Sequence, residues 1–314
     1  MTVRMTVRAL LTIILCAFAA SLATAQAPVY HAETHLVTFS FSVYDPSGNL
    51  VSSLTQNDFN VIEDGVPQQI RFFSRESNLP LTLGLLIDAS PSQNKFIHRH
   101  LRDVQVFLAS VLQPQDRVFA MGFGDHLRIA SDFNDDPAAV IEGIRRYYKD
   151  YSAFPEIDPD ETRDGGTALD DAVYASVTEK LANVASRRKA IVLFTDGEEN
   201  SSAHDEMDAI SAAQNADVLV YAIRYSSTGK PTAGMRHGMA LLQHMAGQTG
   251  GSEFDALHTN LSQDFAQIGA ELRSLYSISY YSTNPRSGNT FHRVVIETRS
   301  RGMTVHARSG YYER

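Results

Sequence analysis

The chain has 314 residues, of which 43% are hydrophobic and 20% charged, and its formal net charge is −9. This apolar content excludes a disordered chain, and 19 Gly and 11 Pro without a repeat exclude collagen. A single Cys excludes a disulfide-stapled fold, and the acidic excess argues against a nucleic-acid groove, which requires clustered Lys and Arg. The length suggests about two domains.

Residues 1–25 have the three-part layout of a secretory signal peptide. Arg4 and Arg8 precede an apolar stretch over 9–20, and an Ala-x-Ala cleavage site ends at Ala25. The apolar stretch is shorter than the roughly 20 residues that a membrane-spanning helix needs. We therefore expect cleavage, no remaining membrane span, and a periplasmic or extracellular location. Lipidation at Cys16 is the rival interpretation, and it is disfavoured because a large residue precedes this Cys. Cleavage after Ala25 would remove Cys16, which is the single cysteine of the sequence.

Residues 26–78 are expected to form an N-terminal β module. Val37, Phe39, Phe41 and Val43 alternate with polar residues, which predicts a half-buried strand. Turn signals and further short strands follow as far as Arg75, and no helical periodicity is found before residue 80.

Residues 79–276 show a different pattern, in which short apolar runs alternate with amphipathic helices. This pattern predicts an α/β fold with a Rossmann-like, doubly wound sheet. The expected strands are 81–87, 118–123, 190–194 and 218–223, and each is a short, almost entirely apolar run, as in strands that are covered on both faces. Asp136 is typical of a helix N-cap and Pro137 of the first helical turn, so a helix is predicted to begin there. Arg187, Arg188 and Lys189 are expected to lie in solvent before the third strand.

Residues 277–314 return to β character, with strands expected over 278–281, 294–298 and 304–307. Three short strands are too few to fold alone. We therefore expect them to complete a small β-sandwich-like module with the N-terminal strands, so that the α/β domain is inserted between its two halves.

Polar residues gather where two core strands end and where one helix begins. Asp88-Ala89-Ser90-Pro91-Ser92 follows the first core strand, and Thr195-Asp196-Gly197 ends the third. Gly165-Gly166-Thr167 comes just before a predicted helix. Ligands of open α/β sheets bind at the carboxyl ends of strands, so two carboxylates and three hydroxyls are expected to converge there.

An all-oxygen set of this kind suits a hard divalent cation, chiefly Mg²⁺. Two carboxylates leave the cation under-neutralised, so an incoming carboxylate could complete its shell, which is a mechanism of recognition and not of catalysis. A zinc site is disfavoured because the sequence has no His-Glu-x-x-His motif and no Cys after cleavage.

The three polar segments resemble, in order, the metal-ion-dependent adhesion site of the von Willebrand factor A domain, and the similarity covers residues 80 to about 276. The resemblance implies Mg²⁺ or Mn²⁺ as the metal and a coupling of partner binding to movement of the last helix, about residues 260–276. It also implies the five metal ligands: Asp88, Ser90, Ser92, Thr167 and Asp196.

The flanking segments 54–65 and 291–312 resemble a secreted bacterial group of related proteins, called the acidobacterial type, whose members have no established activity. One departure concerns the metal loop itself. Pro91 and Gln93 stand where the family commonly has Gly and Met, and family domains can lose the metal and persist as scaffolds.

The expected function is that of a secreted, non-enzymatic module that binds a protein partner through an acidic side chain of that partner. A metal-independent structural or assembly scaffold of the cell envelope is the alternative. A metal-dependent hydrolase is a weaker one, because the chain has no Gly-x-Ser-x-Gly elbow and no identifiable base. The sequence leaves the oligomeric state open.

Overall fold

The structure is a computed structural model that describes residues 36–76, 79–157, 165–226, 230–284 and 290–312. The predicted signal peptide and Cys16 lie outside the described residues. From Leu36 onward the chain forms one compact unit. Within the described ranges, none of the helices has the length and apolar character needed to cross a membrane.

A six-stranded sheet forms the centre of the α/β domain, in the order β10-β9-β8-β5-β6-β7. All neighbours run parallel except β7, which is antiparallel to β6. The doubly wound sheet is therefore confirmed, with one antiparallel edge strand that the apolar runs did not predict. The strands are β5 (Leu81–Asp88), β6 (Arg117–Phe123), β7 (Leu127–Asn134), β8 (Arg188–Thr195), β9 (Val218–Arg224) and β10 (Glu253–Asp255).

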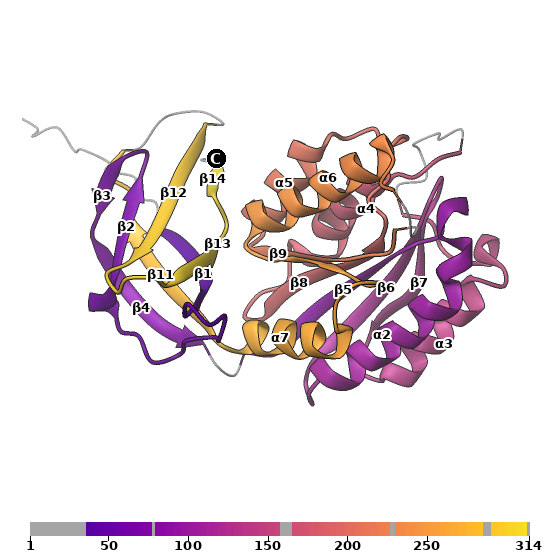
Figure 1. The fold of residues 1–314 in the computed structure, drawn as a ribbon, viewed down its shortest axis with the longest axis horizontal. Helices are drawn as coiled ribbons and strands as arrows, with labels where there is room; N and C mark the ends of the chain where they lie inside the picture. Colours follow the sequence, from indigo (N-terminus) through magenta and orange to yellow (C-terminus); the bar gives the residue numbers. More distant parts are fainter. Residues whose placement is uncertain (1–35, 77–78, 158–164, 227–229, 285–289, 313–314) are drawn as a thin grey trace, which may run out of the picture. The chain divides into compact units, whose positions relative to one another are not determined.

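Two layers of helices cover the two faces of this sheet (Figure 1). One face packs against α2 (Ile97–Val111), α3 (Pro137–Tyr147) and α7 (Leu261–Arg273). The other face packs against α4 (Leu169–Ala175), α5 (Glu206–Asn215) and α6 (Ala233–Thr249). The chain continues from α4 as a π-helix over Ser176–Leu181. The Asp136 carboxylate caps α3 by accepting from the amide of Ala138, as the sequence predicts.

The remaining strands form two four-stranded antiparallel sheets, in the orders β13-β1-β11-β4 and β14-β12-β2-β3. Each sheet combines strands from before and after the α/β domain, which confirms the expected joint β module. The strands are β1 (Leu36–Tyr44), β2 (Phe59–Glu63), β3 (Val66–Gln68), β4 (Ile70–Glu76), β11 (Leu275–Tyr281), β12 (Phe291–Thr298), β13 (Thr304–Ala307) and β14 (Gly310–Tyr312).

Aromatic rings fill the space between these two sheets. The rings of Phe41 and Phe59 meet edge to face at 5.1 Å, and Tyr276 stacks on Phe41 at 5.6 Å. All three are buried. The register pairs Phe39 of β1 with Ile278 of β11, so the alternation that predicted β1 places its apolar face in this core.

Arg188 corrects one expectation of the sequence. Its side chain is only 4% exposed, and it forms an ion pair of 2.5 Å with Glu76 of the β module and a longer one of 3.9 Å with Asp217. A solvated lead-in was expected because three basic residues precede a strand. The structure instead uses the first residue of β8 to join the two parts of the chain, since a charge buried this deeply requires a partner.

Glu271 of α7 forms a second polar link between the β module and the α/β domain. Its carboxylate accepts hydrogen bonds from Tyr44 of β1 and from Tyr221 of β9, the latter at 2.8 Å. Burial raises the pKa of Glu271 to about 8. The protonated form is therefore favoured in the folded protein at neutral pH.

Candidate metal centre

Asp88 is the last residue of β5, the strand that lies between β6 and β8. Its carboxylate is fully buried and accepts the Ser90 amide at 2.9 Å and the Thr195 hydroxyl at 2.5 Å. Burial raises the pKa of Asp88 to about 7, and the nearby charge of Asp196 acts in the same direction. A carboxylate in this position is costly to ionise unless positive charge approaches it.

The two serines of the Asp-x-Ser-x-Ser loop connect Asp88 with the end of β8. Ser90 precedes a 3₁₀ helix over Pro91–Phe96, and Pro91 at its first position fits because its fixed φ is suited to a helical start. The Ser90 and Ser92 hydroxyls lie 3.1 Å apart, and Ser92 donates to Asp196 at 2.8 Å. Four of the five predicted ligands are thus connected through hydrogen bonds at one edge of the sheet.

Thr167 lies in the neighbouring loop and is 3% exposed. Its amide donates to the Asn200 side chain at 2.8 Å, and its carbonyl accepts from the Asn200 amide at 3.1 Å. A Cβ built on Gly124 would lie 3.7 Å from the Ser90 amide and 3.9 Å from the Gly166 carbonyl. The loops that carry Ser90 and Thr167 therefore approach each other on either side of Gly124.

Gly166 is required by this approach, because its φ is +101° and a Cβ there would come within 2.3 Å of the Asn200 side chain. Asn200 was not predicted as part of the site. Its role comes from a contact between two loops distant in sequence, and no local pattern signals it.

Gln93 is the other residue whose role the sequence did not predict. Its side chain is buried, and its amide nitrogen donates to Asp196 Oδ2 at 2.6 Å and to the Tyr225 carbonyl at 3.3 Å. Its amide oxygen is buried and has no hydrogen-bond partner in the described part of the chain. Gln93, one of the two residues that depart from the family pattern, is therefore hydrogen-bonded directly to the Asp196 carboxylate.

The donor set fits a hard divalent cation. Neither Asp88 nor Asp196 forms an ion pair with a Lys or Arg within the described ranges, although both are buried. The charge of Asp196 also makes Asp88 more costly to ionise. Carboxylate and hydroxyl oxygens are the ligands that Mg²⁺ and Mn²⁺ prefer. A divalent ion would supply the positive charge that these two buried groups lack.

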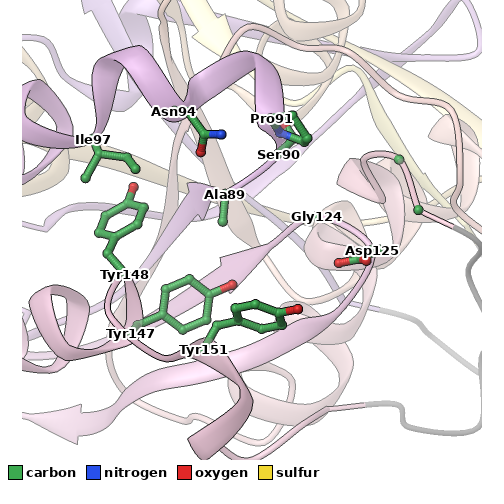
Figure 2. Close-up of a pocket in the computed structure, with 12 residues that line it drawn as sticks. Ala89, Ser90, Pro91, Asn94, Ile97, Gly124, Asp125, Tyr147, Tyr148 and Tyr151 are labelled. Atoms are coloured by element: carbon green, nitrogen blue, oxygen red, sulfur yellow. The ribbon is translucent and has the colours of Figure 1, made fainter.

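A cavity of about 330 Å³ adjoins the metal loop at Ser90 (Figure 2). We call it the tyrosine pocket because three tyrosines from the end of α3 and the turn after it form one wall. Among the described residues, Ala89, Pro91, Ile97 and three glycines also line it. Its polar residues are Ser90, Asn94, Asp125, Tyr147, Tyr148 and Tyr151.

A separate cluster of Glu63, Asp64 and His292 lies in the β module, with ligand-type atoms within 4.8 Å of one another. Tyr280 and Ser282 donate to Glu63, the former at 2.7 Å, and His292 Nδ1 lies 2.9 Å from Asp64. Hydroxyl donors thus already surround the buried carboxylate. We interpret this cluster as a hydrogen-bond network that connects β2, β11 and β12.

The α/β domain is similar to a known family and to several solved structures. The family model of the von Willebrand factor type A domain matches residues 83–270, more than half of the chain. No curated protein matches the chain.

Several solved structures are similar. The conserved hypothetical protein BatB of Bacteroides thetaiotaomicron is 17% identical, with a TM-score of 0.45, over 61% of this chain and 97% of that one. The manganese-loaded TRAP protein of Plasmodium vivax is 15% identical, with a TM-score of 0.44, over 75% and 96%. A von Willebrand factor type A protein of Catenulispora acidiphila is 11% identical, with a TM-score of 0.44, over 90% and 75%.

Proposed function

Because the chain belongs to the von Willebrand factor type A domain family, we propose that it is an exported, non-enzymatic module that binds a protein partner through a divalent metal centre. The proposed ligands are Asp88, Ser90, Ser92, Thr167 and Asp196, and the proposed metal is Mg²⁺ or Mn²⁺. The observation that carries the proposal is the hydrogen-bonded series from Ser90 through Ser92 to Asp196, beside the buried Asp88. Export rests on the layout of residues 1–25, and the acidobacterial subgroup stays a prediction.

Each side chain of the site has a defined part in such binding. When bound, the metal supplies a Lewis-acidic position that accepts a carboxylate oxygen of the partner. Asp88 provides the buried negative charge, and its hydrogen bonds with the Ser90 amide and the Thr195 hydroxyl fix its orientation. Ser90 and Ser92 offer neutral oxygens, so they add no further negative charge that would repel an acidic side chain.

A hydrolytic role has less support in the structure. Ser90 and Ser92 are the available nucleophiles, and within the described residues no histidine contacts either hydroxyl. The partner of Ser92 is the carboxylate of Asp196, which the proposed metal would engage. A serine without a positioned base is a weak nucleophile.

The test is selection of peptides from a random displayed library by the immobilised protein, in Mg²⁺ and in EDTA. Metal-dependent binders that share an Asp or Glu, and that lose binding when this residue becomes Asn or Gln, would support the proposal. Metal-dependent binders without a shared acid would overturn the acidic-partner mechanism. If no binder depends on metal, the scaffold alternative replaces the proposal, and stable oligomers in light scattering would then be expected.

A further inference from the structure

The tyrosine pocket has a rigid wall. Tyr147 is 4% exposed, and its ring packs so closely on Gly122 that a Cβ there would come within 2.1 Å of it. Tyr148 meets Tyr147 edge to face at 6.0 Å, and its hydroxyl lies 3.2 Å from the ring nitrogen of His100. These two rings are therefore held in place before any ligand arrives.

Tyr151 forms the outer part of this wall and is 51% exposed. Its ring centroid lies 6.4 Å from that of Tyr147. Figure 2 shows the hydroxyls of Tyr147 and Tyr151 directed towards the side of the pocket that carries Asp125. The pocket thus combines aromatic faces with a carboxylate at its rim.

The Asp125 carboxylate has no direct ion-pair partner among the described residues. It is half-buried, and within the described ranges it forms no ion pair or side-chain hydrogen bond. Two basic side chains close in sequence, Arg128 and His126, both pair with Glu156, at 3.0 and 2.6 Å. Arg128 also lies over one face of Tyr151, 5.9 Å from its centroid. Among the described residues, the lining of the pocket includes no Lys or Arg.

We propose that the tyrosine pocket receives an arginine side chain of the partner, next to the acidic side chain that the metal centre binds. This inference deepens the proposed function and rests on it. A guanidinium donates to a carboxylate and packs against aromatic rings, so it matches Asp125 together with the tyrosine wall, although Arg128 and His126 already lie against Tyr151. A partner anion would meet the charge of Asp125, and a purely apolar side chain would offer no partner to the hydroxyls of Tyr147 and Tyr151. The volume of about 330 Å³ leaves room for the long side chain and several waters.

The test is an NMR titration of the ¹⁵N-labelled protein with N-acetyl-arginine amide, in excess Mg²⁺ and in EDTA. N-acetyl-citrulline amide is the matched probe, because it has almost the same shape without the charge. We expect amide shifts at Gly124, Gly165 and Gly166, with a dissociation constant on the order of 1 mM for arginine and much weaker binding of citrulline.

Three variants assign the binding to the pocket. Asp125→Asn should weaken arginine binding about tenfold, and Tyr151→Ala about threefold. Asp135→Asn, which removes an exposed acid outside the pocket, should leave it as in the wild type. A thermal melt of each variant checks its folding.

The possible outcomes separate this inference from the proposed function. Equal binding of arginine and citrulline, or arginine binding that Asp125→Asn does not weaken, overturns the arginine pocket even if the protein binds Mg²⁺. Arginine binding that depends on Asp125, in a protein whose stability does not respond to Mg²⁺ or Mn²⁺, supports the pocket and contradicts the proposed metal centre. Arginine binding seen only in EDTA and insensitive to Asp125→Asn assigns the probe to the empty metal loop and overturns the pocket.

Discussion

Replacing Asp88 by Asn tests the metal centre most directly. Burial raises the pKa of this carboxyl from its ordinary value of 3.8 to about 7, and each tenfold change in proton affinity corresponds to about 1.4 kcal/mol. Keeping Asp88 ionised at pH 8 without metal therefore costs roughly 4 kcal/mol. Asn keeps the shape: its oxygen can accept from the Ser90 amide, and its amide can donate to the Thr195 hydroxyl. We expect Asp88→Asn to be more stable than the wild type in EDTA at pH 8.

Metal should reverse this order. At a concentration of about 100 times its dissociation constant, a ligand of the folded state adds roughly 2.7 kcal/mol. For a protein of this size that corresponds to a rise in Tm of roughly 5–10 °C. The assay is dye-based melting in EDTA, Mg²⁺ and Mn²⁺, because the chain has no Trp. The wild type should show the rise and Asp88→Asn should not. Glu271→Gln is the matched control, since it removes another buried acid far from the metal loop and should keep the response.

Two results would refute this reasoning. An equal Mg²⁺ response in Asp88→Asn would place the cation elsewhere in the chain. A variant less stable than the wild type in EDTA at pH 8 would show that the Asp88 carboxylate contributes more through its hydrogen bonds than its burial costs.

Three further predictions concern the same groups. Since protons compete with metal at Asp88, Mg²⁺ affinity measured by calorimetry should be about tenfold lower at pH 6 than at pH 8, and equal affinities would contradict the raised pKa. Gln93→Met removes a donor from Asp196, so Mg²⁺ should bind about fivefold more tightly; weaker binding would mean that Gln93 orients the carboxylate for the metal. The pKa of Glu271 is raised in the fold, so the folded state binds the extra proton between about pH 4.5 and 8 and stability falls as pH rises through this window. The free energy of unfolding, measured in urea with Mg²⁺ present, should fall from pH 5 to pH 8 in the wild type. In Glu271→Gln this fall should be smaller by a few kcal/mol.

The sequence patterns predicted those elements whose structure depends mainly on residues close together in the chain. β5 and β8 are mostly apolar because both of their faces are covered, and the cap of α3 needs only Asp136 and Pro137. The approach of Asp88 to Asp196 follows from the rule that neighbouring parallel strands end at the same edge.

The unpredicted features depend on contacts between distant segments. β7 is a partly exposed edge strand whose pairing with β6 is irregular, so it has no clear apolar run. Gln93 and Asn200 join the site through neighbours more than thirty residues away, with separations of 103 and 33 in the chain. Arg188 was expected in solvent because its ion-pair partner Glu76 lies 112 residues earlier.

The interleaved sheets of the β module have a consequence for how the chain folds. β1 pairs with β11, and Thr38 and Ser279 are in contact although they are 241 residues apart. During synthesis β2 can pair at once only with β3, whereas β1 and β4 must wait for β11. Closing a loop of that length from the unfolded chain is slow. The inserted domain removes most of this cost, because its two ends leave it side by side, with Glu76 paired to Leu275. Once that domain has folded, the strands on both sides are already neighbours. We therefore expect the α/β domain to fold first and the β module second, so a variant that unfolds the insert should also leave the terminal strands unpaired.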